Sequence, residues 1–100
     1  MAVSKDPTKK FLAAVGEKIR HYRLKRGLTL EALGEDIGLD KANVHKIESG
    51  QNITLRTLLK VAAFLEVKPV DLISDGPLMA YEEAEDYVRR QKRKRKASRR

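Results

Sequence analysis

Hydrogen-bond donors recur on one face of a short predicted helix between residues 41 and 49. The outward positions of that helix are occupied by Lys41, Ala42, His45, Lys46 and Ser49. Val44 and Ile47 form the apolar pair that faces inward. Side chains at the outward positions can reach the major groove of a duplex, although a solvated surface lysine is the alternative for each lysine alone. For His45, which is mostly neutral in the cell, a groove contact and no role are equally open.

Residue patterns for catalysis are missing from the sequence. It contains no cysteine, which excludes disulfides and thiolate metal sites. It also has no glycine-rich phosphate loop, no cluster of histidine and carboxylate with metal-ligand spacing, and no serine motif of the strand-to-helix type. We therefore predict a protein that is not an enzyme, with no catalytic residue, no metal and no cofactor.

Length and charge favour a single domain with a polyanionic partner. One hundred residues without an internal repeat predict about one domain. The net charge of +8 favours polyanions. No apolar run approaches the roughly 18 to 20 residues that cross a bilayer, and residues 1–10 lack the apolar core of a secretory signal. We expect a cytoplasmic, nucleoid-associated protein without a membrane partner.

Helices must position the outward face, because no stretch alternates β-branched and polar residues as a strand would. Five helices are predicted ahead of residue 76, at 7–26, 30–38, 41–49, 55–65 and 69–73. Their predicted N-caps include Asp6, Thr29, Asp40 and Thr54. The fold class is therefore all-α.

Three apolar stripes are expected to build the core. The first helix contributes Phe11, Val15, Ile19 and Tyr22; the fourth contributes Leu55, Leu58, Leu59, Ala62 and Leu65; the fifth contributes Val70, Leu72 and Ile73. The fourth helix has the widest apolar face and should be central to the core. His21 is expected to have a structural role.

Two glycines shape the join between the second and third helices. Gly38 fits a sharp turn with positive φ, which glycine adopts most easily. Gly34 costs up to about 1 kcal/mol within a helix, and close approach of another helix would compensate. Together they predict two helices that cross steeply.

Residues 77–100 differ in charge from the rest of the chain. Residues 1–76 hold 13 Lys and Arg against 10 Asp and Glu, whereas residues 77–100 hold 9 against 4. A sixth helix over 78–90 would align Leu78, Tyr81, Glu85 and Val88, and could pack on the domain, pair with a second copy or form only in part. The run 89–100 has nine basic residues and no acid, so we expect it to be extended and mobile.

The basic run 89–100 has three possible roles. It could be a solvated tail, a non-specific phosphate arm, or a segment that binds RNA or an acidic partner. Counterion release and tethering favour the phosphate arm. We divide the chain into a DNA-binding domain at 1–76 and a C-terminal helix with a flexible basic tail at 77–100.

The sequence resembles the helix-turn-helix family of phage Cro and C1 repressors, also called XRE-like, over residues 11–73, about two-thirds of the chain. The matching motifs are VGEKIRHYRLKRGLTLEALGEDIGL, VHKIESG and TLLKVAAFLEVKPVDLI. The resemblance implies a compact five-helix, lambda-repressor-like domain, here with an added C-terminal helix and basic tail.

Functional residues follow from the resemblance only at matching positions. It implies base contacts from Lys41, Ala42, His45 and Lys46, and backbone contacts from Asp40, Ser49, Gln51, Asn52, Thr54 and Arg56. It also implies a partly buried ion pair between Arg23 and Glu48 that joins the first helix to the recognition helix.

Three positions depart from the family pattern. Leu30 stands where the family commonly has a glutamine that touches a phosphate, and Gly34 stands where alanine is usual. The carboxylate of Asp40 would lie near phosphates.

The leading interpretation is a double-stranded-DNA-binding repressor acting as a homodimer at least on DNA. The alternative is an antitoxin or bridging coactivator that binds a protein partner through 78–88.

Overall fold

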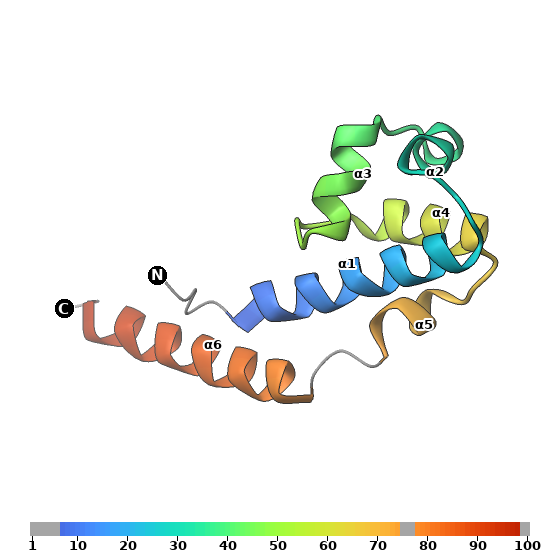
Figure 1. Ribbon diagram of the computed structural model, residues 1–100. Helices are drawn as coiled ribbons and strands as arrows, with labels where there is room; N and C mark the ends of the chain where they lie inside the picture. The colour runs from blue at the N-terminus through green and yellow to red at the C-terminus, as the bar shows by residue number, and fades with distance from the viewer. Residues whose placement is uncertain (1–6, 75–77, 99–100) are drawn as a thin grey trace, which may run out of the picture.

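The computed structural model describes residues 7–74 and 78–98, with side chains described at 8–74 and 84–94, and every regular element there is a helix. The helices are α1 (Pro7–Lys25), α2 (Leu30–Ile37), α3 (Lys41–Glu48), α4 (Leu55–Leu65), α5 (Pro69–Ile73) and α6 (Leu78–Ser98) (Figure 1). The all-α prediction is confirmed, and the five ranges before residue 76 differ from it by at most one residue. The Asp6 cap, the break at 75–77 and the side chains of Leu78 and Tyr81 lie outside the described residues.

Local chemistry sets the ends of the helices as predicted. A side-chain oxygen at each N-cap accepts a backbone N–H bond: Thr29 from Ala32 (3.1 Å), Asp40 from Asn43 (2.8 Å) and Thr54 from Thr57 (3.1 Å). Gly38 ends α2 with φ of 78°. Because these signals act within a few residues, they set where α2, α3 and α4 begin and where α2 ends along the chain without help from the core.

One apolar core joins α1 to α5. Its buried members are Val15, Ile19, Leu33, Ile37, Val44, Leu58, Val61, Ala62, Leu65 and Leu72. The expected contributions of α1 and α4 are confirmed in part, since both helices supply several of these residues. The core thereby fixes α2 and α3 relative to the longer helices.

The predicted face of α4 was wrong at two positions. Leu55 is 82% exposed and Leu59 is 60% exposed, whereas Val61 is buried. Positions 55 and 59 lie at the edge of the apolar stripe, so the rotation of α4 that buries Val61 turns both leucines outward.

Three further predicted core residues lie at the surface. Phe11, Val70 and Ile73 are exposed, while Leu72 on the same short helix as the last two is fully buried. A helix of five residues has a single inward position per turn, and in α5 that position belongs to Leu72.

The prediction of an extended basic tail was also wrong. The sixth helix does not stop near Arg90 but continues to Ser98. Arginine, lysine, glutamine and alanine are good helix formers. Ion pairs one turn apart, Arg89 with Glu85 at 2.9 Å and Arg90 with Asp86 at 2.8 Å, reduce the repulsion where the basic run begins.

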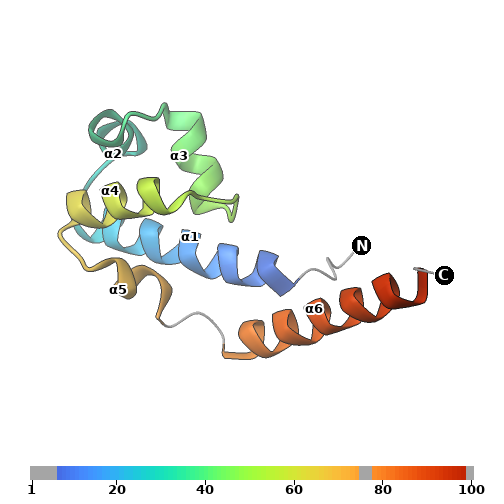
Figure 2. The same cartoon turned by 180° about the vertical axis from the view of Figure 1, so that it is seen from behind.

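The elements are arranged around α1. In both views α2 and α3 lie on one side of α1, and α5 and α6 lie on the other (Figures 1 and 2). α6 packs against α1 and runs on past its beginning. Of the helices described, none has the length and apolarity needed to cross a membrane.

Candidate nucleic-acid interface

A close approach of backbones seats α3 on α1. Gly16 is buried in the middle of α1, and a Cβ atom there would lie 2.5 Å from the carbonyl oxygen of Ile47 and 2.6 Å from that of Glu48. Only glycine leaves room for the last turn of α3 at this distance. The sequence prediction missed Gly16, although a glycine inside a predicted helix was the available signal.

A buried ion pair locks the same contact. The Nε atom of Arg23 donates to Oε2 of Glu48 at 2.6 Å, and its Nη2 donates to Oε1 at 3.0 Å. The Nη1 atom donates to the carbonyl oxygen of Leu28 at 2.7 Å. Both charged residues are buried, at 7% and 8% exposure. The expected pair is confirmed, and its forked geometry holds α3 at a fixed angle to α1.

The turn between α2 and α3 requires both glycines that the sequence singled out. A Cβ atom on Gly34 would collide with the carbonyl oxygen of Leu39 and lie 3.2 Å from Cγ2 of Val44. The expected close approach at Gly34 is therefore confirmed, and it involves the turn as well as α3. Gly38 supplies the positive φ of the reversal.

The exposed face of α3 carries the predicted base-contacting residues together. Lys41, Ala42, His45 and Lys46 are all exposed, as is Ser49, a predicted backbone contact beside them, whereas Val44 is buried and Ile47 is half-buried. Two of the neighbouring polar groups already have partners. The Ser49 hydroxyl donates to the carbonyl of His45 at 2.9 Å, and the Asp40 carboxylate is occupied in capping.

An unpredicted acidic side chain lies beside the first lysine of this face. The Nζ atom of Lys41 is 3.3 Å from Oε1 of Glu31, and both side chains are more than half exposed. A hydrogen bond from its own backbone N–H and the adjacent Lys41 ammonium lower the pKa of Glu31 below its ordinary value. The pair joins the amino-terminal ends of α2 and α3, which neither local sequence could reveal.

A groove separates α3 from the beginning of α1. Its lining residues are Lys9, Leu12, His45, Lys46, Ser49, Gly50, Gln51 and Asn52, and its volume is about 550 Å³. Two lysines therefore border one open hollow next to the predicted phosphate-contacting loop. Lys9 was not predicted, because its distance from α3 depends on the packing of α1.

The loop and the beginning of α4 offer the remaining predicted contacts. Gln51, Asn52, Thr54 and Arg56 are exposed. The Thr54 hydroxyl caps α4 and also donates to the Thr57 hydroxyl at 3.0 Å. Leu30, by contrast, is half-buried and packs on the core, so it contributes no polar group at the start of α2.

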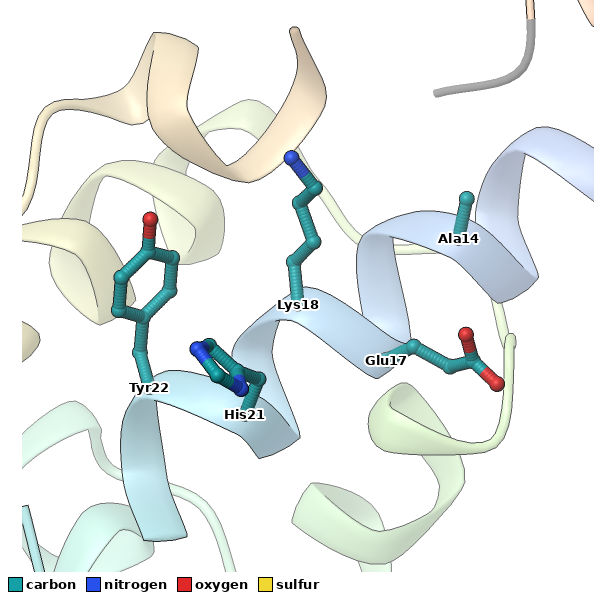
Figure 3. A pocket seen from close by; sticks show the side chains of 5 residues that line it. All are labelled: Ala14, Glu17, Lys18, His21 and Tyr22. Atoms are coloured by element: carbon teal, nitrogen blue, oxygen red, sulfur yellow. The ribbon is translucent and has the colours of Figure 1, made fainter. Parts of the chain in front are cut away.

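A second hollow lies on α1. Figure 3 shows the described residues around it, Ala14, Glu17, Lys18, His21 and Tyr22, with Lys18 and Tyr22 pointing to the same side of the helix. The exposed His21 ring meets the Tyr22 ring edge-on, with centroids 5.3 Å apart. Among the described residues, no group of three or more potential metal ligands occurs.

Comparison with known proteins identifies relatives of this arrangement. The helix-turn-helix family matches residues 19–72. The HTH-type transcriptional regulator SlrR of Bacillus subtilis is 37% identical over 70 residues, which cover 68% of this chain and 45% of SlrR. An uncharacterized HTH-type transcriptional regulator of Sinorhizobium medicae is 34% identical over 83 residues, or 74% of this chain and 60% of that protein. The chain thus spans about half the length of these relatives.

A solved structure supports the same likeness. The restriction-modification controller protein C.AhdI from Aeromonas hydrophila superposes with a TM-score of 0.59 at 35% sequence identity. The match covers 61% of this chain and 94% of C.AhdI.

Proposed function

The chain belongs to the Cro/C1-type helix-turn-helix family of DNA-binding transcriptional regulators, and from this premise we propose that it is a sequence-specific repressor rather than an enzyme. The exposed face of α3 carries the proposal. Lys41 and Lys46 can donate to guanine O6 and N7, and the Ala42 methyl can contact a thymine methyl. His45 completes this base-reading set.

Phosphate contacts would fix the register of α3 in the major groove. Gln51, Asn52 and Arg56 supply exposed amide and guanidinium donors. Asp40 and Thr54 flank them and would contribute through backbone N–H groups, because their side chains cap α3 and α4. The backbone N–H of Ser49 is bonded within α3, so Ser49 would contribute by turning its hydroxyl from the His45 carbonyl to a phosphate. Since Leu30 has no polar side chain, contacts to the DNA phosphates would come from this loop and the beginning of α4.

Two copies of the chain would bind a two-fold operator at the nucleoid. Domains of this kind place recognition helices in successive major grooves, about 34 Å apart. Binding there would occlude a promoter and repress transcription.

Selection of bound sites from random duplex DNA tests the proposal. A palindromic consensus with half-sites about one helical turn apart is the expected result. A pool that stays random after repeated selection would contradict sequence-specific recognition, and a single unpaired half-site would contradict the homodimer.

A protein-binding function is the second candidate, because α6 exposes apolar side chains. Val88 is 51% exposed, and Tyr87 is also exposed. An antitoxin or bridging coactivator would cover them with a partner. Purification of a stoichiometric complex in which residues 78–88 are protected from hydrogen exchange would favour this function.

A further inference from the structure

Charge is segregated along α6. Residues 78–88 contain four acidic residues and no base, whereas residues 89–98 contain seven basic residues and no acid. Arg89 and Arg90 are paired with acids of the preceding turn. Lys92 and Arg93, farther along, have exposed side chains. The positive charge therefore accumulates toward the carboxyl end of α6.

The helix gives this charge a defined shape. At a rise of about 1.5 Å per residue, residues 89–98 form a rod about 15 Å long, which equals about four base-pair steps of B-DNA. Basic residues near the end of a helix also interact favourably with its dipole. Because the rod is already folded, binding an anionic partner costs less ordering entropy than it would for an extended tail.

The rod lies at the end of the molecule that also carries the groove beside α3. Lys9 and Leu12, near the beginning of α1, line that groove with His45 and Lys46. From its contact with α1, α6 continues past the same end of α1, away from α2 and α4 (Figures 1 and 2). The acidic half of α6, residues 78–88, lies nearer to α5. The basic half, residues 89–98, is therefore the part that extends past the beginning of α1.

We propose that residues 89–98 of α6 form a second DNA-binding surface, which contacts the phosphate backbone beside the base pairs that α3 reads. This inference rests on the proposed function, because α3 must first bring a duplex to that end of the molecule. The binding partner of the rod is duplex DNA, since the sequence of the rod has lysine and arginine at successive turns and their charge complements a phosphate backbone. The contact adds affinity independent of sequence, and it requires DNA that extends beyond the half-site.

Charge removal on the rod tests the proposal against a matched control. The triple variant Lys92→Gln, Arg93→Gln and Lys96→Gln keeps good helix formers in α6. The control, Lys25→Gln, Lys60→Gln and Lys68→Gln, removes the same net charge at exposed positions away from the beginning of α1. Fluorescence anisotropy with duplexes of 12 and 30 base pairs of random sequence, at several salt concentrations, reports non-specific affinity directly.

We expect the triple variant to bind the 30-base-pair duplex at least tenfold more weakly, with the salt slope reduced by up to about 2.7, or about 0.9 for each lost phosphate contact. The loss should be smaller on 12 base pairs, and the control should change little. Equal losses for both variants would assign the effect to net charge and overturn the proposal, as would unchanged binding. A loss on structured RNA but not on duplex DNA would make RNA the partner and also overturn it.

A helix-breaking variant separates the folded rod from a flexible tail. Gln91→Pro retains every charge but interrupts α6. We expect it to lose affinity for the 30-base-pair duplex, whereas wild-type affinity would show that the helix is not required. These measurements use random sequences, so failure of α3 to select an operator would overturn the proposed function without deciding this one, and failure of the rod would leave operator selection intact.

Discussion

We propose that two lysines of α3 read bases directly, whereas Arg56 contacts the phosphate backbone. We expect Lys41→Ala and Lys46→Ala each to lower affinity by about 1 to 3 kcal/mol at particular base pairs, because a lost donor matters only where its acceptor was present. Arg56→Ala should weaken binding to all sequences and reduce the salt slope by about 1. Titrations against a panel of single-base operator variants distinguish these patterns. An identical loss on every sequence for all three variants would contradict direct readout.

Glu31 should tune the first of these lysines. Its carboxylate holds Lys41 at 3.3 Å and would lie near DNA phosphates, so Glu31→Gln releases the lysine and removes repulsion. We expect two- to tenfold tighter binding to all duplexes, about what one unit charge contributes near a surface, with altered preference at the base that Lys41 reads. Glu35→Gln, at another exposed acid of α2, is the control. Weaker binding by Glu31→Gln would show instead that the carboxylate presents Lys41 productively.

The pH dependence of this pair has a definite sign. Because the pKa of Glu31 is lowered on folding, the contribution of the pair to folding stability is fully present above the pKa that Glu31 has in the unfolded state. Its contribution is lost as the pH falls through the lower folded pKa. Near neutral pH the carboxylate is therefore charged, and Glu31→Gln should have the same effect on binding at pH 6.5 and at pH 8.

The buried pair of Arg23 and Glu48 holds α3 against α1. Glu48→Ala leaves the guanidinium buried without its carboxylate, so we expect unfolding free energy to fall by about 3 to 5 kcal/mol. The exposed pair of Arg26 with Glu66, at 3.1 Å, provides the comparison, and Arg26→Ala should cost less than about 1 kcal/mol. Urea denaturation followed by circular dichroism measures both. Similar losses in the two variants would mean that burial does not decide the contribution of the first pair.

Local signals made most helix ends predictable, whereas orientation between helices was not. Caps such as Thr29 and the turn at Gly38 act within four residues, so sequence alone suffices there. The outward positions of Leu55 and Leu59 depend on how α4 rotates against α1, which a stripe of apolar residues leaves open. The pairing of Glu31 with Lys41 likewise requires the angle between α2 and α3.

The candidate site was predictable to the extent that α3 itself was. A single helix period places Lys41 and Lys46 on the face opposite Val44, and the structure keeps them exposed. Lys9 comes from α1, far away in sequence, and enters the groove only through tertiary packing. The helical state of residues 89–98 was not predicted, because repulsion within the basic run opposes a helix, whereas helix propensity and the ion pairs that begin the run favour one.

The whole molecule combines one core with one appended helix. Among the described side chains, every member of the buried core comes from α1 to α5, and α6 packs against α1. The proposed recognition by α3 and the proposed non-specific attraction by α6 are therefore separable, because different elements would carry them. We propose on this basis that residues 1–76 are an autonomous DNA-binding domain.

Removing residues 77–100 tests that division. The shortened chain loses a net charge of +5, from nine basic and four acidic residues, but no member of the described core. We expect its unfolding free energy to change by less than about 1 kcal/mol, a limit that corresponds to a Tm shift of about 4 to 8 °C. Its base preferences should persist. Affinity should fall on all sequences alike, with a flatter salt dependence. A shortened chain that unfolds, or that selects different base pairs, would show that α6 is part of the DNA-binding domain, because its contact with α1 would then be needed to position α3.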